Sequence, residues 1–373
     1  MGHTHKAVVN YALDGLAVHE AQSHVQFARQ LAALMQAEFA GTYEASLPDS
    51  AFYFVPSRTL LLREAQELGI ASERDLYGGV VPARFVATKA ISHGLIDPQA
   101  DAPPGWQREL AGRVQNVVHR GFTAFSAEDA RRIAARLLPA GSIRIKPPLS
   151  RGGSDQEIVA QEADLARALE AIDETDIREC GLVLEENLSK VATLSVGELC
   201  VDTLHVVYCG TQRLTANNHG DEVYGGSDLL LARGGFAALL PVVSDPNALL
   251  AIEQAREFDA AVNDCFPAMF ASRRNYDVAQ GEVRGQWRSG VLEQSWRVGG
   301  ATGAELAGLA ALQADPALGR VRASCHEVYG PLDAPRPPEA MVYFRGEDTR
   351  TGPITKYAVV HGEPGRGHRN RGG

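Results

Sequence analysis

Long apolar runs, paired cysteines and clustered histidines are all missing from this 373-residue sequence. A membrane-spanning helix needs roughly 18 to 20 uninterrupted apolar residues, and no stretch comes near that length. His3, His5 and Lys6 are not followed by an apolar segment, so a secretory signal is not expected. The five cysteines show no Cys-x-x-Cys spacing, which is usual for reduced thiols and unlike a zinc motif. We therefore expect a cytoplasmic protein without a transition metal.

An excess of basic residues is also absent. The chain has 36 Lys and Arg against 46 Asp and Glu, a formal net charge of −10. Nucleic-acid binding normally requires a basic face, so we expect no nucleic-acid partner. A few local cations are still enough for the phosphates of a small nucleotide. The basic, glycine-rich residues 361–373 are expected to form a flexible tail.

The first 85 residues alternate strand and helix signals. Strands are predicted at 6–11 and 51–55, and helices at 18–35 and 59–68. Val18, Val25 and Ala28 belong to an apolar series spaced by three and four, which predicts the buried face of the first helix. This order predicts a small parallel α/β unit.

The signals after residue 85 are mixed. Ser126 and Asp245 are predicted to cap helices. Residues 215–235 are rich in Asn, Gly, Asp and Ser and predict no single element. We predict an α/β and α+β fold, in which α+β elements follow the N-terminal parallel unit. Its further elements are strands at 142–146, 157–160, 181–184, 276–279 and 290–294, helices at 163–172 and 246–262, and β-rich sequence at 193–208.

Two short segments suit a nucleotide. Lys146 ends a predicted strand before a flexible turn that contains Ser150, Gly152 and Gly153, and such a turn lets backbone N–H groups approach phosphate oxygens. It is not a Walker loop, and a surface lysine before an ordinary turn would have the same sequence. Glu185 and Glu186 end a buried strand, where an acid and backbone groups can bind the amino edge of adenine. A solvated acidic pair is the alternative.

A late hairpin carries the most informative pattern. Asp277 lies on one predicted strand and Glu293 on the next, so antiparallel pairing can place the two carboxylates side by side. Magnesium prefers such hard oxygen ligands, usually one or two carboxylates beside substrate phosphates. Ser295 and Arg297 share the face of Glu293, and Arg297 could neutralise a transferring phosphoryl group. A structural network of acids and arginine is the alternative.

Arg233 is the remaining candidate for chemistry. It follows a polar, glycine-rich segment that also contains His219, and such loops commonly carry function. The segment could equally be a surface excursion.

The order of these motifs resembles that of the ATP-grasp superfamily, from residue 89 to residue 305. The runs that carry the resemblance are Val86-Ala87-Thr88-Lys89-Ala90, Arg144-Ile145-Lys146-Pro147, Val183-Leu184-Glu185-Glu186-Asn187-Leu188, Tyr276-Asp277-Val278 and Leu292-Glu293-Gln294-Ser295-Trp296-Arg297. The run from Gly290 to Gly300 also looks like an uncharacterised bacterial family of ATP-grasp-like proteins with no assigned substrate.

The resemblance implies that Lys89 and Lys146 hold ATP phosphates and that Glu185, Glu186 and Leu188 form the adenine hinge. It implies that Asp277, Glu293 and Ser295 bind Mg²⁺. Ser295 stands where the family usually has asparagine. The acid that commonly holds the ribose is replaced by a segment of Val191, Ala192 and Thr193.

The expected activity is an ATP- and Mg²⁺-dependent, ADP-forming ligase that joins a small carboxylate to an amine through an acyl phosphate. Arg297 and Arg233 are the expected catalytic residues. A kinase on the same fold and a non-catalytic nucleotide-binding protein are the alternatives, and a homodimer is one option for assembly. The predicted divisions are 1–85 for the N-terminal domain, 86–190 for the first lobe, 191–360 for the second lobe and 361–373 for the tail.

Overall fold

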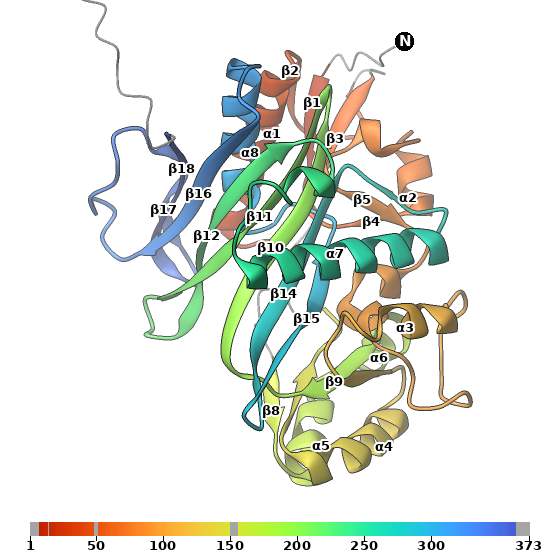
Figure 1. Ribbon diagram of the computed structural model, residues 1–373. Helices are drawn as coiled ribbons and strands as arrows, with labels where there is room; N and C mark the ends of the chain where they lie inside the picture. Colours follow the sequence, from red (N-terminus) through yellow and green to blue (C-terminus); the bar gives the residue numbers. More distant parts are fainter. Residues whose placement is uncertain (1–6, 14, 48–50, 150–155, 363–373) are drawn as a thin grey trace, which may run out of the picture.

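The computed structural model describes residues 7–13, 15–47, 51–149 and 156–362 (Figure 1). A three-stranded parallel sheet with the order β2-β1-β3 begins the chain. Helix α1 (Val18–Leu34) connects β1 to β2. This confirms the parallel α/β unit and adds a strand, β2, that the sequence patterns missed. The strands are β1 (Ala7–Tyr11), β2 (Glu38–Thr42) and β3 (Phe52–Pro56).

The predicted buried face of α1 is confirmed at Ala28 but is wrong in the first turn of the helix. Val18 is 40% exposed, whereas His19, Ser23 and Phe27 are buried. The buried stripe therefore begins with polar side chains and becomes apolar only towards the C-terminal half of the helix. No helix in the described ranges is long and apolar enough to cross a membrane.

A second small sheet joins distant parts of the chain in the order β13-β5-β4. The helix predicted for residues 59–68 is confirmed over Leu62–Glu67, but it begins later than predicted because Leu60 pairs with Val80 in a parallel bridge. Three 3₁₀ turns lead onward from this region. The elements are β4 (Leu60–Leu61), α2 (Leu62–Glu67), η1 (Glu73–Asp75), β5 (Gly79–Val81), η2 (Arg84–Ala87), η3 (Lys89–Ser92) and β13 (Phe270–Ala271).

A four-stranded sheet follows, with the order β6-β9-β7-β8. Ile143 and Ile145 of β7 pack in one hydrophobic cluster with residues of α4 and α5. Because side chains alternate along a strand, Arg144 and Lys146 lie on the opposite face. The elements are α3 (Arg108–Val114), β6 (Gly121–Ala124), α4 (Ala127–Leu137), η4 (Leu138–Ala140), β7 (Ile143–Lys146), β8 (Glu157–Val159), α5 (Glu162–Glu170), α6 (Glu174–Cys180) and β9 (Leu182–Glu186).

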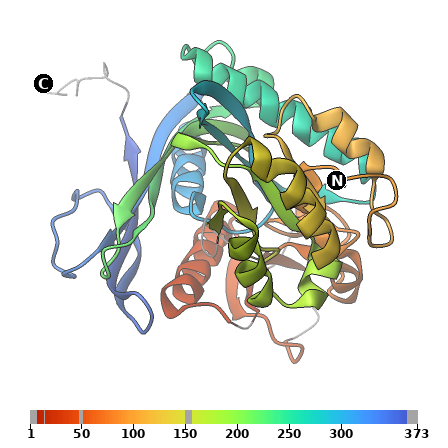
Figure 2. The same ribbon diagram turned by 90° about the horizontal axis from the view of Figure 1, so that it is seen from below.

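An eight-stranded antiparallel sheet forms the largest layer, with the order β15-β14-β10-β11-β12-β16-β18-β17. Helix α7 crosses one face and α8 covers the other (Figures 1 and 2). On β11, Val207 and Cys209 join the cluster beneath α7, and Val206 and Tyr208 join the cluster beneath α8. The elements are β10 (Ser189–Val201), β11 (Leu204–Ala216), β12 (Glu222–Arg233), η5 (Phe236–Ala238), α7 (Pro246–Cys265), β14 (Arg273–Val283), β15 (Gln286–Ser295), α8 (Thr302–Ala314), β16 (Arg320–Tyr329), β17 (Met341–Asp348) and β18 (Gly352–His361).

Strand β12 corrects the interpretation of residues 215–235 as a segment without a single element. It pairs with β11 on one side and β16 on the other. Gly226 has a φ of +136°, and a Cβ there would lie 2.0 Å from the carbonyl oxygen of Cys325. The absence of a side chain at Gly226 therefore permits the backbones of β12 and β16 to approach closely.

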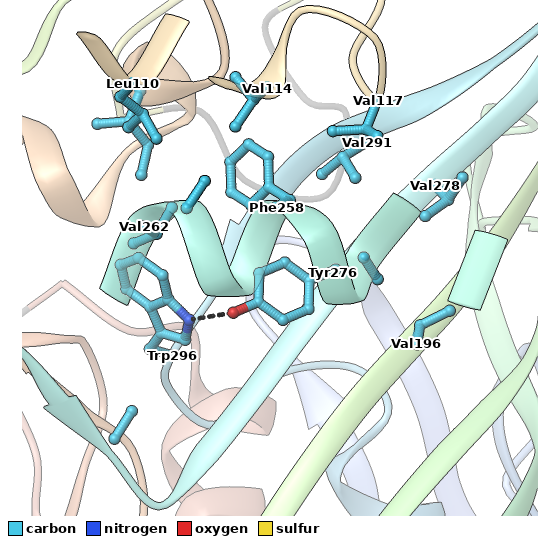
Figure 3. Close-up of a cluster of buried hydrophobic side chains, with 14 of the residues drawn as sticks. Leu110, Val114, Val117, Val196, Phe258, Val262, Tyr276, Val278, Val291 and Trp296 are labelled. Carbon is cyan, nitrogen blue, oxygen red and sulfur yellow. Dashed lines mark hydrogen bonds between the residues drawn. The ribbon is translucent and has the colours of Figure 1, made fainter. Parts of the chain in front are cut away.

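The core beneath α7 fixes the hairpin β14–β15 (Figure 3). Phe258 of α7 packs edge-on against Tyr276, whose hydroxyl accepts a hydrogen bond from Trp296 Nε1 at 3.5 Å. With Tyr276 and Trp296 held on this face, alternation places Asp277 and Ser295 on the opposite face. The apolar side of the hairpin thus orients its polar side.

Candidate active site

Two carboxylates lie side by side on the hairpin. In the β14–β15 register Asp277 is the partner of Glu293, as the sequence predicted. Asp277 Oδ1 accepts hydrogen bonds from Gln212 Nε2 at 2.8 Å, Asn275 Nδ2 at 3.0 Å and Ser195 Oγ at 3.1 Å. Three donors on one oxygen fix the orientation of this carboxylate.

The pair has an unbalanced charge distribution. Burial raises the pKa of Asp277, and the neighbouring Glu293 raises it further. Burial opposes the ionisation of Glu293 as well, but Lys89 and Lys146 outweigh it and hold the pKa of Glu293 below its usual value. A bound cation would relieve the repulsion between the two acids.

Both predicted phosphate-binding lysines are buried and ion-paired. Lys89 starts the 3₁₀ turn η3, is 4% exposed, and places Nζ 3.1 Å from Glu293 Oε2. Lys146 is 3% exposed, and its Nζ lies 2.5 Å from Glu185 Oε1. Each positive charge is thus compensated by a carboxylate of this chain.

Two histidines that the sequence analysis did not single out extend this network. His93 Nε2 lies 3.0 Å from Glu185 Oε2, and His119 Nε2 lies 3.2 Å from the carbonyl oxygen of Ala279. Burial would raise the pKa of Glu185, but Lys146 and His93 hold it well below its usual value. Burial lowers the pKa of His119. Ionisable side chains therefore form a continuous series from Asp277 to His119.

This series joins two cavities. The larger, of about 580 Å³, is lined by His93 and His119, by the strand end at Glu186 and Asn187, and by the tip of the hairpin at Arg284. The smaller, of about 350 Å³, is lined by Asp277, Glu293, Ser295 and Arg297, by α1, and by β16 and β18. One end of the series faces each cavity.

The predicted adenine hinge divides into different environments. Glu185 uses both oxygens on Lys146 and His93, whereas Glu186 lines the larger cavity and its buried Oε1 has no hydrogen-bond partner among the described residues. Leu188 is 8% exposed and packs against Ala279. Glu186 is thus the acid best placed to accept a ligand donor. The predicted loop residues Ser150, Gly152 and Gly153 lie outside the described residues.

A buried arginine supports strand β15. Arg273 Nη1 donates to the carbonyl oxygen of Ser295 at 3.0 Å and to its Oγ at 3.3 Å. The same guanidinium contacts Glu305 through Nη2 at 2.7 Å and Nε at 3.0 Å. Hydroxyls of Tyr77 and Tyr208 also bind Glu305, at 2.6 and 2.8 Å. Sequence reasoning missed Glu305, which sits in the first turn of α8.

The two predicted catalytic arginines separate in the structure. Arg297 lines the smaller cavity, with Nη1 donating to the carbonyl oxygen of Val298 at 2.7 Å. Arg233 lies at the end of β12 and donates to the carbonyl oxygens of Leu318 and Leu312. The structure does not bring Arg233 to the carboxylate pair, because its guanidinium ties β12 to the last turn of α8 and to the segment after it.

The residues present fit a divalent cation that also binds a ligand. Among the described residues no group of three or more His, Cys, Asp and Glu side chains is placed to hold a metal. Asp277 and Glu293 offer two carboxylates, and burial, followed by the negative charge of Glu293, raises the pKa of Asp277. Further oxygens would come from a phosphate chain, which is usual for Mg²⁺.

Solved structures with the same fold include three enzymes. A biotin carboxylase from Campylobacter jejuni in a β-γ-ATP complex is 10% identical with a TM-score of 0.55, and the match covers 96% of this chain and 87% of that chain. An N5-carboxyaminoimidazole ribonucleotide synthetase in an ADP complex is 13% identical with a TM-score of 0.53, and the match covers 95% of this chain and 92% of that chain. A phosphoribosylamine–glycine ligase from Thermotoga maritima is 16% identical with a TM-score of 0.52, and the match covers 95% of this chain and 92% of that chain. At these identities the similarity shows the fold alone, and that fold is ATP-grasp. No curated protein matches the sequence.

A family match covers nearly the whole chain. Residues 8–358 match the family described as "Protein of unknown function (DUF3182)". The chain therefore belongs to this family, and its members' fold is represented here by an ATP-grasp architecture.

Proposed function

We propose that this protein is an ATP- and Mg²⁺-dependent ligase that joins a small carboxylate to an amine and forms ADP. The observation that carries the proposal is the pairing of Asp277 with Glu293, whose Oε2 lies 3.1 Å from Lys89 Nζ. Lys146 is close enough to lower the pKa of Glu293. Two partly buried acids beside two buried lysines suit a metal–triphosphate complex better than they suit a purely structural network.

The two cavities suggest how ATP lies in the site. The adenine would occupy the larger cavity, where Glu186 Oε1 can accept a hydrogen bond from its amino group. The phosphates would follow the lysines towards Asp277 and Glu293, which would hold Mg²⁺. The carboxylate substrate, which accepts the phosphoryl group, would enter the smaller cavity beside Arg297. When bound, Mg²⁺ supplies charge neutralisation at the phosphates.

Lys146 and Lys89 already lie against carboxylates, so phosphate oxygens would replace or share those partners. In the first step a substrate carboxylate oxygen bonds to the γ-phosphorus and ADP leaves. In the second step the amine nitrogen bonds to the acyl carbon and phosphate leaves. Arg297 would stabilise the charge that moves between these atoms.

The structural neighbours support this class of reaction. One neighbour is a ligase for phosphoribosylamine and glycine, and others were crystallised with ATP-type ligands or ADP. We further propose a cytoplasmic location, which the five free cysteines support. Nucleic acid and membranes are not proposed as partners.

A hydroxylamine trap tests the proposal. Wild-type protein would be incubated with Mg²⁺-ATP, pooled carboxylates and hydroxylamine, and ADP and hydroxamate would be measured together. We expect equal amounts of both products, and a severe loss of both in Glu293→Gln. Glu67→Gln, on α2 in an exposed pair with Arg63 and outside the lining of both cavities, is the control and should behave as wild type. A phosphorylated alcohol without hydroxamate would indicate a kinase, and nucleotide binding without any product would indicate a binding protein.

A further inference from the structure

The first two turns of α1 present polar side chains to the smaller cavity. His19, Glu20, Ser23 and His24 line it, and one turn later Phe27 begins the apolar part of the same stripe. Residues spaced by three and four share one side of a helix. A buried helix face that served only packing would be expected to stay apolar. The polar side chains in the first two turns of α1 therefore suggest that a ligand binds beside them.

His19 is the clearest member of this polar stripe. It is 8% exposed, and its backbone N–H donates to Asp348 Oδ2 at 3.2 Å. Its ring lies edge-on to Phe344 at 6.1 Å, and its buried Nδ1 has no hydrogen-bond partner among the described residues. A buried polar atom without a partner is unfavourable, so a ligand that donates a hydrogen bond to Nδ1 would remove that cost.

The opposite wall is almost neutral. Lys356 Nζ donates to Glu327 Oε1 at 2.9 Å, and the two side chains are 8% and 11% exposed. Glu20 adds a further negative charge from α1, and one of its oxygens is 3.2 Å from the backbone nitrogen of Ala17. The part of the cavity that Glu20, Glu327 and Lys356 line, which we call its outer end, therefore favours a cation. Arg297 lines the same cavity together with the carboxylate pair.

We propose that the outer end of the smaller cavity binds the amine substrate as a small primary ammonium beside Glu20, and that His19 Nδ1 accepts its proton. The inference rests on the proposed ligase function. It goes beyond that function in naming where the amine binds, its chemical class and the residue that deprotonates it. A cavity of about 350 Å³ suits a small molecule rather than a protein chain.

The protons balance in this scheme. The ammonium gives one proton to His19 Nδ1 and becomes a neutral amine. As the new C–N bond forms and the C–O bond to phosphate breaks, the second proton leaves with phosphate. His19 then returns its proton to solvent.

The surroundings of His19 keep its ring neutral. Burial lowers the pKa of His19, Lys356 lowers it further, and Glu327, Glu20 and Asp348 oppose them. His24, Tyr329 and Tyr343 are the other titratable groups that line this part of the cavity. A neutral imidazole is the form that a general base requires.

A comparison of two nucleophiles tests the proton step. Ammonium and hydroxylammonium differ in acidity, so hydroxylamine is largely unprotonated at neutral pH and needs no base to free its lone pair. One accepted carboxylate would be given either hydroxylamine or a probe amine from a panel of ammonium, ethanolamine and glycine. We expect His19→Gln to lower amide formation about 100-fold more than hydroxamate formation at neutral pH. The deficit should narrow as pH rises through the pKa of the probe amine.

One variant serves as a control for the proton step, and two results would overturn that step. His205→Gln alters an exposed histidine that pairs with Glu198 outside the cavity, and both products should match wild type. Equal losses of amide and hydroxamate in His19→Gln at every pH would show a structural role and overturn the proton step. An unchanged rate of amide formation would overturn it too.

Binding without turnover tests the amine site separately. At least one probe amine should raise the melting temperature of the wild type, and Glu20→Gln should remove that shift. Stabilisation by carboxylates alone, or by no probe, would overturn the amine site. If amines stabilise the wild type through Glu20 but no carboxylate gives hydroxamate, the amine site is supported and the proposed ligase function, with its proton step, fails.

Discussion

Replacing Glu305 by glutamine should be among the most destabilising conservative changes in this protein. Glu305 is fully buried and its partner Arg273 is 1% exposed. Glutamine has nearly the same shape, and its amide oxygen can still accept a bond from Tyr77 or Tyr208. It removes the charge that compensates the guanidinium.

The expected magnitude follows from this burial. Removing one partner of a buried ion pair leaves an uncompensated charge, which costs about 3–5 kcal/mol. Because the tyrosine bonds can survive, we expect the lower end, about 3 kcal/mol. The matched control is Glu282→Gln, since Lys190 is 75% exposed in that pair and such pairs contribute about 0–1 kcal/mol.

Denaturant unfolding followed by circular dichroism measures both variants. Burial opposes ionisation of Glu305, but Arg273 outweighs it and holds the pKa of Glu305 below its usual value. The ionised group therefore stabilises the fold above the ordinary glutamate pKa, and this contribution disappears as pH falls through the folded-state pKa. The difference between wild type and Glu305→Gln should be full at neutral pH and shrink in acid. A neutral-pH loss no larger than that of Glu282→Gln would refute the reasoning.

Three further predictions concern single positions. Asp277→Asn should stabilise the nucleotide-free protein at neutral pH. The pKa of Asp277 is raised in the folded state, so the protonated side chain stabilises the fold below the unfolded-state pKa and this contribution is lost as pH rises. Melting curves across pH measure the difference, and a variant less stable than the wild type at neutral pH would contradict it. Lys146→Gln leaves the buried Glu185 without Lys146 and should lower the free energy of unfolding, measured with denaturant, by about 3 kcal/mol. The same change should abolish the rise in melting temperature that ATP causes. An unfolding midpoint equal to that of the wild type would show that the pair is not needed for stability. Gly226→Ala should lower the yield of folded protein because its Cβ would collide with the Cys325 carbonyl, whereas Gly112→Ala on α3 meets open space and should not; equal yields would mean that β12 and β16 can separate cheaply.

Local signals in the sequence predicted much of the fold. Ser126 Oγ accepts from the backbone of Asp129 at 3.2 Å, and Asp245 caps α7, as the residue patterns indicated. The hairpin was predicted for the same reason, and its turn residues Arg284 and Gly285 have positive φ angles. The turn alone would place Asp277 opposite Leu292, but the register shifts by one residue between Asp277 and Val278 and brings Glu293 there instead. The sequence therefore predicted that the two strands bring Asp277 and Glu293 together, but not the shift that aligns them.

Tertiary contacts determine what the sequence analysis missed. His93 and Glu185 are 92 positions apart, and their bond depends on how η3 packs against β9. Arg233 was assigned to the site on loop composition, but it belongs to an interior strand. The start of the buried face of α1 was predicted wrongly because Val18 is apolar, whereas the structure exposes Val18 and buries the neighbouring His19.

Positional isotope exchange in ATP tests the central claim most directly. ATP labelled with ¹⁸O at the bridge between the β- and γ-phosphates would be incubated with protein, Mg²⁺ and single carboxylates, without an amine. If the site transfers the γ-phosphoryl group reversibly to a carboxylate, the label will scramble into non-bridging positions with at least one carboxylate, and Glu293→Gln will abolish the exchange. Tight binding of Mg²⁺-ATP without exchange for any carboxylate, together with phosphate transfer to a hydroxyl or to no acceptor, would contradict the ligase account.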